Sequence, residues 1–199
     1  MVTVNSPAEI LSVPANLKRW TVEEYHQLSE LGLLTPDERT ELIAGQILIK
    51  PVKSPAHVVA LQLLALQIKE YLRERPFFAC TQDPVQLNDC SEPEPDLAII
   101  QGELLTYTDR HPKPEDIFLI VEVADSTLKQ DCQVKDKTYA KANIAEYWVL
   151  DLPNQRLHVF QKPTATGYSS HLILSQDNQV SPLAFPEFLL DIASLFPTR

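Results

Sequence analysis

Two acidic residues stand at the ends of apolar segments, where carboxylates could bind a metal ion. Asp96 opens the segment DLAII, and Glu122 lies near the end of the segment DIFLIVEVA. If the second segment is a strand, alternate residues share one face with Glu122: Phe118, Ile120 and Ala124. A glutamate in such surroundings is costly to bury unless it is paired, protonated or bound to a metal ion. The pattern predicts a partner for Glu122, and Asp96 could supply a second oxygen ligand for Mg²⁺.

An aspartate, a lysine and a tyrosine follow at helical spacing. Asp131, Lys135 and Tyr139 recur at every fourth position, so they lie on one flank of a helix. We expect Lys135 to return over the end of the Glu122 strand. A lysine there could help to deprotonate an attacking water or stabilise negative charge that develops on a phosphate. Carboxylates and a lysine in this arrangement point to phosphodiester hydrolysis.

These residues need a sheet and covering helices to bring them together. Helices are expected over residues 23–32, 56–75, 127–143 and 186–196. Strands are expected over residues 46–52, 76–83, 84–89, 96–100, 116–124, 146–152, 156–163 and 168–175. The order strand, helix, strand over residues 116–152 is typical of an α/β domain with a parallel strand pair.

The N-terminal region has its own signals. Residues 1–18 are expected to form a flexible arm, and residues 19–199 a single domain. Thr21 followed three residues later by Glu24 predicts a capping box at the start of the first helix. A short helical turn that begins at Thr35 is expected to carry Glu41.

Composition limits the partners and the compartment. The net charge of -10 argues against broad, nonspecific binding to nucleic acid, so any contact with DNA must be local. A bound divalent cation could still invert the charge of an acidic cleft. We expect a cytoplasmic protein, because the chain has neither a signal peptide nor an apolar run of the roughly 18–20 residues that span a membrane. The three cysteines show no spacing typical of zinc sites or disulfides.

Several motifs together resemble one known family. They are Pro95-Asp96, Val121-Glu122-Val123, the pattern D-x-x-x-K-x-x-x-Y from Asp131 to Tyr139, and the segment EYWVLD at residues 146–151. With the N-terminal run from Trp20 onward, they resemble the Uma-type restriction endonuclease family, a bacterial group abundant in cyanobacteria. That family belongs to the PD-(D/E)XK nuclease superfamily, and the resemblance extends from Trp20 to Phe196.

The resemblance implies a restriction-endonuclease-like α/β fold, in which a mixed central sheet is flanked by helices. It implies a DNA endonuclease that uses Mg²⁺, with Mn²⁺ as a substitute. Asp96 and Glu122, with a backbone carbonyl near Val123, would hold the metal, while Lys135 and Glu41 complete the catalytic set. The plain superfamily motif has a lysine two residues after the acid, where this chain has alanine. In this family the lysine is expected on the next helix.

Other interpretations stay open. Glu122 and Lys135 could form a structural ion pair in an inactive binding or regulatory module, or the site could hydrolyse another phosphodiester. His57, at the start of its helix, could reach a phosphate or be structural. Asp131 could orient Lys135 or bind the metal, and Tyr139 could pack the core. Cleavage of both DNA strands would favour a homodimer.

Overall fold

The computed structural model describes residues 17–35 and 37–197. The predicted flexible arm over residues 1–18 lies outside these residues apart from Leu17 and Lys18. None of the helices in the described ranges is long and apolar enough to cross a membrane.

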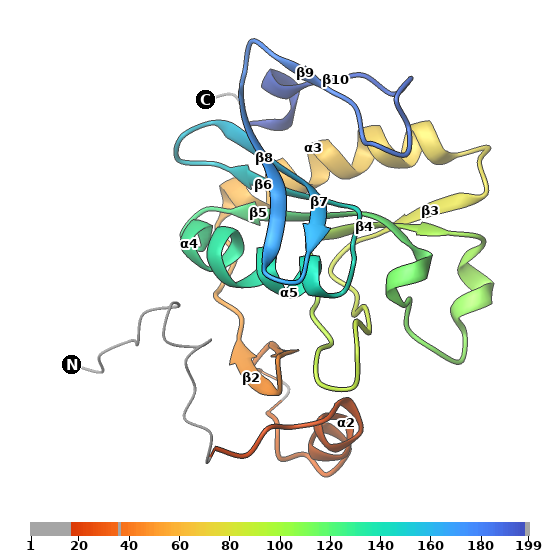
Figure 1. The fold of residues 1–199 in the computed structure, drawn as a ribbon, viewed down its shortest axis with the longest axis vertical. Coiled ribbons are helices and arrows are strands. Elements are labelled where there is room, and N and C mark those ends of the chain that lie inside the picture. Colours follow the sequence, from red (N-terminus) through yellow and green to blue (C-terminus); the bar gives the residue numbers. More distant parts are fainter. Residues whose placement is uncertain (1–16, 36, 198–199) are drawn as a thin grey trace.

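A six-stranded sheet forms the centre of the protein (Figure 1). In spatial order its strands are β3 (Phe77–Cys80), β4 (Leu97–Gln101), β5 (Ile117–Ala124), β6 (Glu146–Asp151), β7 (Arg156–Thr164) and β8 (Gly167–Ser175). β5 and β6 are parallel, whereas the other neighbouring pairs are antiparallel. The predicted mixed sheet with a parallel pair at its centre is confirmed.

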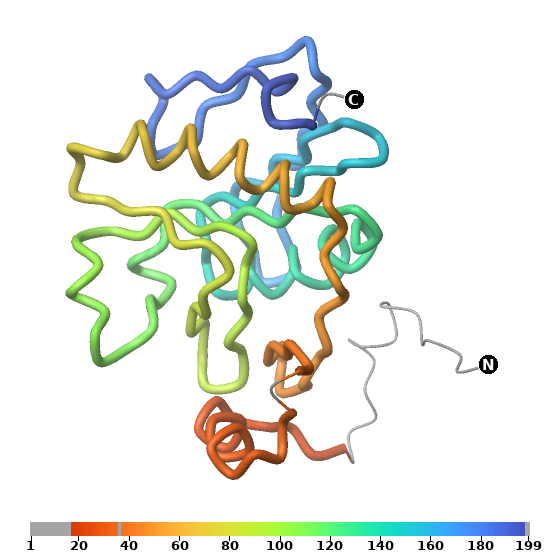
Figure 2. The backbone as a smooth tube through the Cα atoms, turned by 180° about the vertical axis from the view of Figure 1, so that it is seen from behind, coloured from red at the N-terminus to blue at the C-terminus, as the bar shows by residue number. Residues whose placement is uncertain are grey.

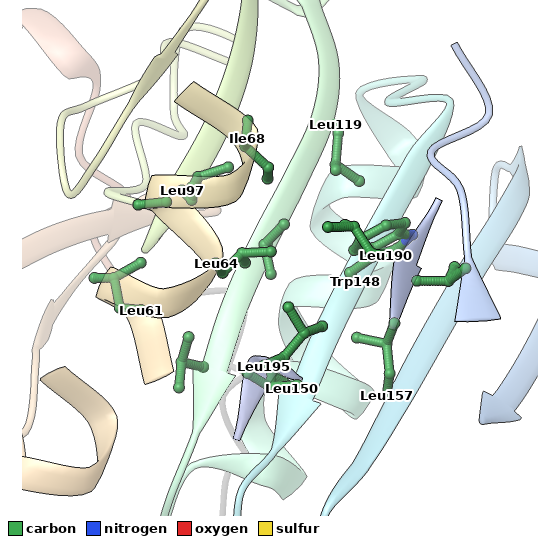
Figure 3. Close-up of a cluster of buried hydrophobic side chains, with 14 of the residues drawn as sticks. Leu61, Leu64, Ile68, Leu97, Leu119, Trp148, Leu150, Leu157, Leu190 and Leu195 are labelled. Carbon is green, nitrogen blue, oxygen red and sulfur yellow. The ribbon is translucent and has the colours of Figure 1, made fainter. Parts of the chain in front are cut away.

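The helix α3 (Pro55–Leu72) covers one face of this sheet. It begins with Pro55 at its first turn, and the Ser54 hydroxyl accepts a hydrogen bond from the His57 backbone N–H at 3.1 Å. Its buried residues, among them Leu64 and Ile68, pack against side chains of the central strands (Figure 3). This packing fixes the position of His57 over the end of the sheet.

The opposite face is covered by the chain between β5 and β6 (Figure 1). It forms α4 (Leu128–Gln130), a π-helical turn η3 (Asp131–Lys135) and α5 (Asp136–Lys141) in direct succession. The predicted helix over residues 127–143 is therefore present but contains a π turn, in which the Asp136 N–H bonds to the Asp131 carbonyl. Such turns insert an extra residue and are frequent at functional sites.

The N-terminal region forms a helix and a hairpin beside the sheet (Figure 2). The helix α2 (Val22–Glu30) begins with the predicted capping box between Thr21 and Glu24. The predicted helical turn with Glu41 is wrong, because this residue lies in β1 (Thr40–Ile43), which pairs with β2 (Gln46–Ile49). Ala44 and Gly45 between them have positive φ angles of 50° and 78°, as a tight hairpin turn requires.

Three local predictions also differ from the structure. An irregularity in the pairing of β4 with β5 turns Phe118 to the face of α3, so it does not share the face of Glu122. The expected strand over residues 84–89 is reduced to one bridge between Asn88 and Ser91.

The expected C-terminal helix is the third difference. Residues 186–196 form only a 3₁₀ turn, η4 (Ile192–Leu195), preceded by the two-residue strand β10 (Leu190–Asp191), which pairs with β9 (Gln179–Val180). Two further 3₁₀ turns, η1 (Leu104–Tyr107) and η2 (Pro114–Asp116), lie between β4 and β5.

Candidate active site

Asp96 is held at the start of β4 by three hydrogen-bonding neighbours. Its Oδ2 accepts from the Val123 backbone N–H at 2.8 Å. Its Oδ1 lies 3.0 Å from Nε2 of Gln82, which donates to it, and 3.1 Å from Nε2 of His57. Burial alone would raise the pKa of Asp96, but His57, Gln82 and the Val123 amide together lower it to about 2. Asp96 is thus a buried carboxylate that stays ionised.

Glu122, Lys135 and Glu41 meet in a second buried group. The Lys135 ammonium donates to Oε1 of Glu122 at 2.8 Å and lies 3.0 Å from Oε1 of Glu41. Oε2 of Glu41 also accepts from the Glu94 backbone N–H at 3.3 Å. All three side chains of the group are nearly inaccessible to solvent. The close contact between Glu122 and Lys135 that an ion pair would need, left open as an interpretation, is present.

The pKa values of both Glu122 and Lys135 are raised in this group, which favours a proton on Glu122 and a charged lysine. Burial raises the pKa of Glu122 to about 8, against the opposing effect of Lys135, and the neighbouring charges of Asp96, Asp131 and Glu41 raise it further. Burial would lower the pKa of Lys135, but Glu122, Glu41 and Asp131 hold it well above its ordinary value. Lys135 also faces Glu41 and Asp131, so it keeps negatively charged neighbours when Glu122 carries a proton.

Tyr139 and Asp131 adjoin the group from the covering helix. The Tyr139 hydroxyl donates to Oε1 of Glu122 at 2.9 Å. Oδ2 of Asp131 accepts from the Thr127 hydroxyl at 2.6 Å, and burial raises the pKa of Asp131 to about 6 despite the nearby Lys135. Asp131, Lys135 and Tyr139 are all buried, as expected if the flank that they share faces the sheet.

A cleft of about 70 Å³ connects these residues to solvent, which is room for several waters or a hydrated ion. Of the predicted site residues it is lined by Asp96, Glu122, Lys135, Glu41, Val123, His57 and Asp131. Tyr139 does not line the cleft and contacts Glu122 from the core side.

The basic residues of the cleft and one glutamine beside it were not predicted from the sequence. Arg39, Lys50 and Lys53 line the cleft, and Gln82 bonds to both Asp96 and the Lys53 ammonium. Gln82 has a φ angle of 62°, which is uncommon for a residue with a side chain. No spacing rule links these positions to the acidic residues, since all four lie in loops, Arg39 directly before β1 and Lys50 directly after β2.

The family model Uma2, described as "Putative restriction endonuclease", matches residues 22–193. The chain belongs to the Uma2 family. No curated protein sequence matches it. The predicted family is confirmed, and membership places the protein among nucleases, a class of hydrolases.

A solved structure supports the fold of this Uma2 protein. The crystal structure of "a putative nuclease belonging to DUF820" from Anabaena variabilis aligns with a TM-score of 0.66 and 18% sequence identity. The alignment covers 88% of this chain and 97% of the Anabaena chain. At this level of identity the likeness shows a shared fold, and the predicted restriction-endonuclease-like α/β class is confirmed.

Proposed function

We propose that this Uma2 protein is a divalent-metal-dependent endonuclease that hydrolyses DNA phosphodiester bonds, with Mg²⁺ as the cofactor and Mn²⁺ as a substitute. One observation carries the proposal. Asp96, Glu122 and Glu41 come from three separate strands or strand ends, and all line one cleft together with the buried ammonium of Lys135. Buried carboxylates are rarely gathered in this way unless they bind a cation or take part in catalysis.

The donor groups of the cleft fit a hard divalent cation. Both hydrogen bonds that the described residues donate to Glu122 end on Oε1, which leaves Oε2 for another cation. Asp96 is ionised and hydrogen-bonded, as a preorganised ligand should be. We assign the metal to Asp96, Glu122 and the Val123 carbonyl, with Glu41 tuning the site or holding a second ion. When bound, the metal would neutralise charge on the scissile phosphate and favour ionisation of water.

Lys135 would act as a fixed positive charge. Its raised pKa means that at neutral pH it donates hydrogen bonds and does not accept a proton. It would therefore stabilise negative charge that develops on the phosphate. Glu41 and Glu122 keep it in place, and Glu122 is itself held by the Tyr139 hydroxyl, so that the position of Lys135 is set before substrate binds.

The rim of the cleft would receive the DNA backbone. Arg39, Lys50 and Lys53 gather there in an otherwise acidic protein. Burial lowers the pKa of Lys53, and the neighbouring Arg39 and Lys50 lower it further, which is a sign that the positive charges crowd together. His57 also lines the cleft and could reach a phosphate while it holds Asp96. Local contacts of this kind are compatible with the net charge of -10.

A second candidate function rests on the ion pair itself. Lys135 and Glu122 contact each other directly at 2.8 Å, so a binding or regulatory module could retain this pair without catalysis.

Endonuclease action on both DNA strands would require two active sites, which we propose are supplied by a symmetric homodimer.

The decisive experiment measures cleavage of plasmid and short duplex DNA with Mg²⁺ or Mn²⁺. We expect Glu122→Gln to lower the cleavage rate by roughly 100-fold or more, since even groups behind the metal ligands contribute about 10–100-fold. Glu146→Gln is the matched control, because Glu146 is also a fully buried strand glutamate but lies outside the cleft. If the wild-type protein cleaves no faster than Glu122→Gln, the nuclease proposal fails.

Calorimetric titration with Mn²⁺ separates the two candidate functions. An active centre should bind Mn²⁺ and lose this binding in Asp96→Asn. A structural ion pair predicts that neither protein binds Mn²⁺ at the cleft. Circular dichroism of each variant checks that the fold is retained.

A further inference from the structure

A second group of metal-ligating side chains lies away from the cleft. His26 of α2, Glu92 of the β3–β4 connection and His111 of the β4–β5 connection each offer one ligand atom, and these atoms all lie within 4.8 Å of one another. Nε2 of His26 lies 2.6 Å from Oε1 of Glu92. The rings of His26 and His111 meet edge to face, with centroids 6.2 Å apart. None of the three residues lines the cleft of Asp96 and Glu122.

Backbone hydrogen bonds hold the segments that carry these side chains. The Glu92 N–H and carbonyl both pair with Leu42 of β1, at 2.8 and 3.2 Å. The Val22 N–H at the start of α2 bonds to the Asp89 carbonyl at 2.8 Å, which ties the helix to the segment of Glu92. Beside His111, the Pro112 carbonyl accepts from the Gln86 N–H at 2.9 Å. In Figure 2, α2 accordingly lies against the loops that join the strands. The ligand atoms are therefore brought together by the fold.

One side-chain oxygen of Glu92 is buried in this group without a hydrogen-bond partner among the described residues. Its side chain is only 3% exposed, and its Oε2 has no hydrogen-bond partner within the described residues. A buried carboxylate oxygen without a partner is costly, and coordination of a cation is one way to remove that cost.

The surrounding groove is suited to a positive ion. It has a volume of about 720 Å³ and is also lined by Glu23, Glu30 and Asp109. Its one arginine, Arg110, is engaged by the Asp116 carboxylate through two hydrogen bonds of 2.6 and 3.2 Å. The groove thus combines acidic charge with two imidazoles and an unpartnered carboxylate oxygen.

We propose that His26, Glu92 and His111 form a Zn²⁺ site that is distinct from the nuclease centre. Two imidazoles and one carboxylate are a known ligand set for zinc, with a fourth position left to water, and the open groove can supply that water. Imidazole ligands favour Zn²⁺ over Mg²⁺, so the two centres would take different ions.

Binding requires a small local movement. Two ligands of one tetrahedral zinc ion are about 3.3 Å apart, given bonds of about 2.0–2.1 Å, whereas His26 and Glu92 are 2.6 Å apart as a hydrogen-bonded pair. The ion would replace this hydrogen bond, and the His26 ring would move outward. Its side chain is 45% exposed, so the movement displaces no core residue.

The zinc site would stabilise the segment that carries Glu41. It would join α2 to both loops, and Glu92 is paired through its backbone with Leu42, the residue next to Glu41. Zinc would therefore stabilise the N-terminal region as a unit, without contact with the nuclease ligands.

The test is calorimetric titration of the full chain with ZnCl₂, in a variant that carries Asp96→Asn and Glu122→Gln so that the nuclease centre cannot contribute. We expect one Zn²⁺ per chain, and an affinity that falls about tenfold or more when His26→Ala or His111→Ala is added. Gln27→Ala is the matched control, because Gln27 neighbours His26 on α2 and lines the same groove. Substitution of Co²⁺ should give the visible absorption of a tetrahedral site, and this absorption should disappear in the histidine variants.

Several outcomes would overturn the zinc site. They are no Zn²⁺ uptake by the chain without the nuclease ligands, uptake that neither histidine variant weakens, and equal weakening by Gln27→Ala. If one histidine variant unfolds, the other histidine variant and its Co²⁺ spectrum still test whether the zinc site exists. The zinc site and the nuclease proposal are tested separately, because DNA cleavage by the wild-type protein is measured with Mg²⁺ or Mn²⁺ and without added Zn²⁺.

Discussion

The Lys135 ammonium lies 3.0 Å from Oε1 of Glu41, although 94 residues separate the two in the chain. Glu41 comes from the N-terminal hairpin and Lys135 from the π turn after the central strand β5. Their contact places a lysine between carboxylates from two different strands, since Glu122 of β5 lies 2.8 Å from the same ammonium. This contact joins the N-terminal region to the core.

Replacing Lys135 should destabilise the protein strongly. Lys135→Met leaves Glu41 buried without its counter-charge and removes a hydrogen-bond donor to Glu122, and loss of one partner of a buried pair typically costs about 3–5 kcal/mol. The free energy of unfolding is measured in urea at neutral pH. Lys141→Met, an exposed lysine of α5, is the control and should change it by about 0.5 kcal/mol or less. A loss as small as that of the control would show that the buried group contributes little to folding.

Metal affinity should rise with pH. In the metal-free protein the pKa of Glu122 is raised to about 8, so below that pH the carboxyl group carries a proton that a metal ion must displace. Between about pH 6 and pH 8 the Mn²⁺ affinity should increase, approaching about tenfold per pH unit for one released proton. Titrations in two buffers with different ionisation enthalpies measure that release. An affinity that is constant over this range would contradict the proposed role of Glu122 as a ligand.

Asp96 should stabilise the fold against mild acid. Its pKa is about 2 in the folded protein, below its ordinary value of 3.8. A lowered pKa contributes stability that is fully present above the ordinary pKa and is lost as the pH falls toward the folded value. We expect a contribution of about 2 kcal/mol, lost between about pH 4 and pH 2.

The measurement is urea unfolding over that pH range for the wild-type protein and Asp96→Asn. Other acids titrate in both proteins, so the difference between them isolates Asp96. This difference should shrink as the pH falls, and a difference that is independent of pH would contradict the assignment.

Lys53 should contribute to DNA affinity through a phosphate contact. Lys53→Ala should weaken binding of different duplex sequences to a similar extent and reduce the slope of log affinity against log salt by about one. Binding is measured by fluorescence anisotropy in Ca²⁺, without cleavage. Lys69→Ala, an exposed lysine of α3 outside the cleft, should leave the slope unchanged, and equal effects of the two variants would place the DNA elsewhere.

The sequence by itself determined the elements whose signals are local. The capping box at Thr21, the helical spacing of α3 and the apolar runs of β5 and β6 each depend on neighbours along the chain. The single acid within β5 pointed to Glu122 for the same reason, because a charge in a buried strand needs a partner wherever the rest of the chain lies. The family could be predicted for the same reason, because its motifs are short segments that can be recognised along the sequence.

Only the tertiary structure decided which groups meet. Glu41 sits in a strand because residues 40–43 pair with a hairpin partner, whereas its charged local sequence suggested a helical turn. Lys135 meets Glu41 across 94 positions of the chain. His26, Glu92 and His111 come from three segments with no common spacing. Contacts between residues far apart in the chain arise from the packing of whole elements, and no local pattern of residue types records them.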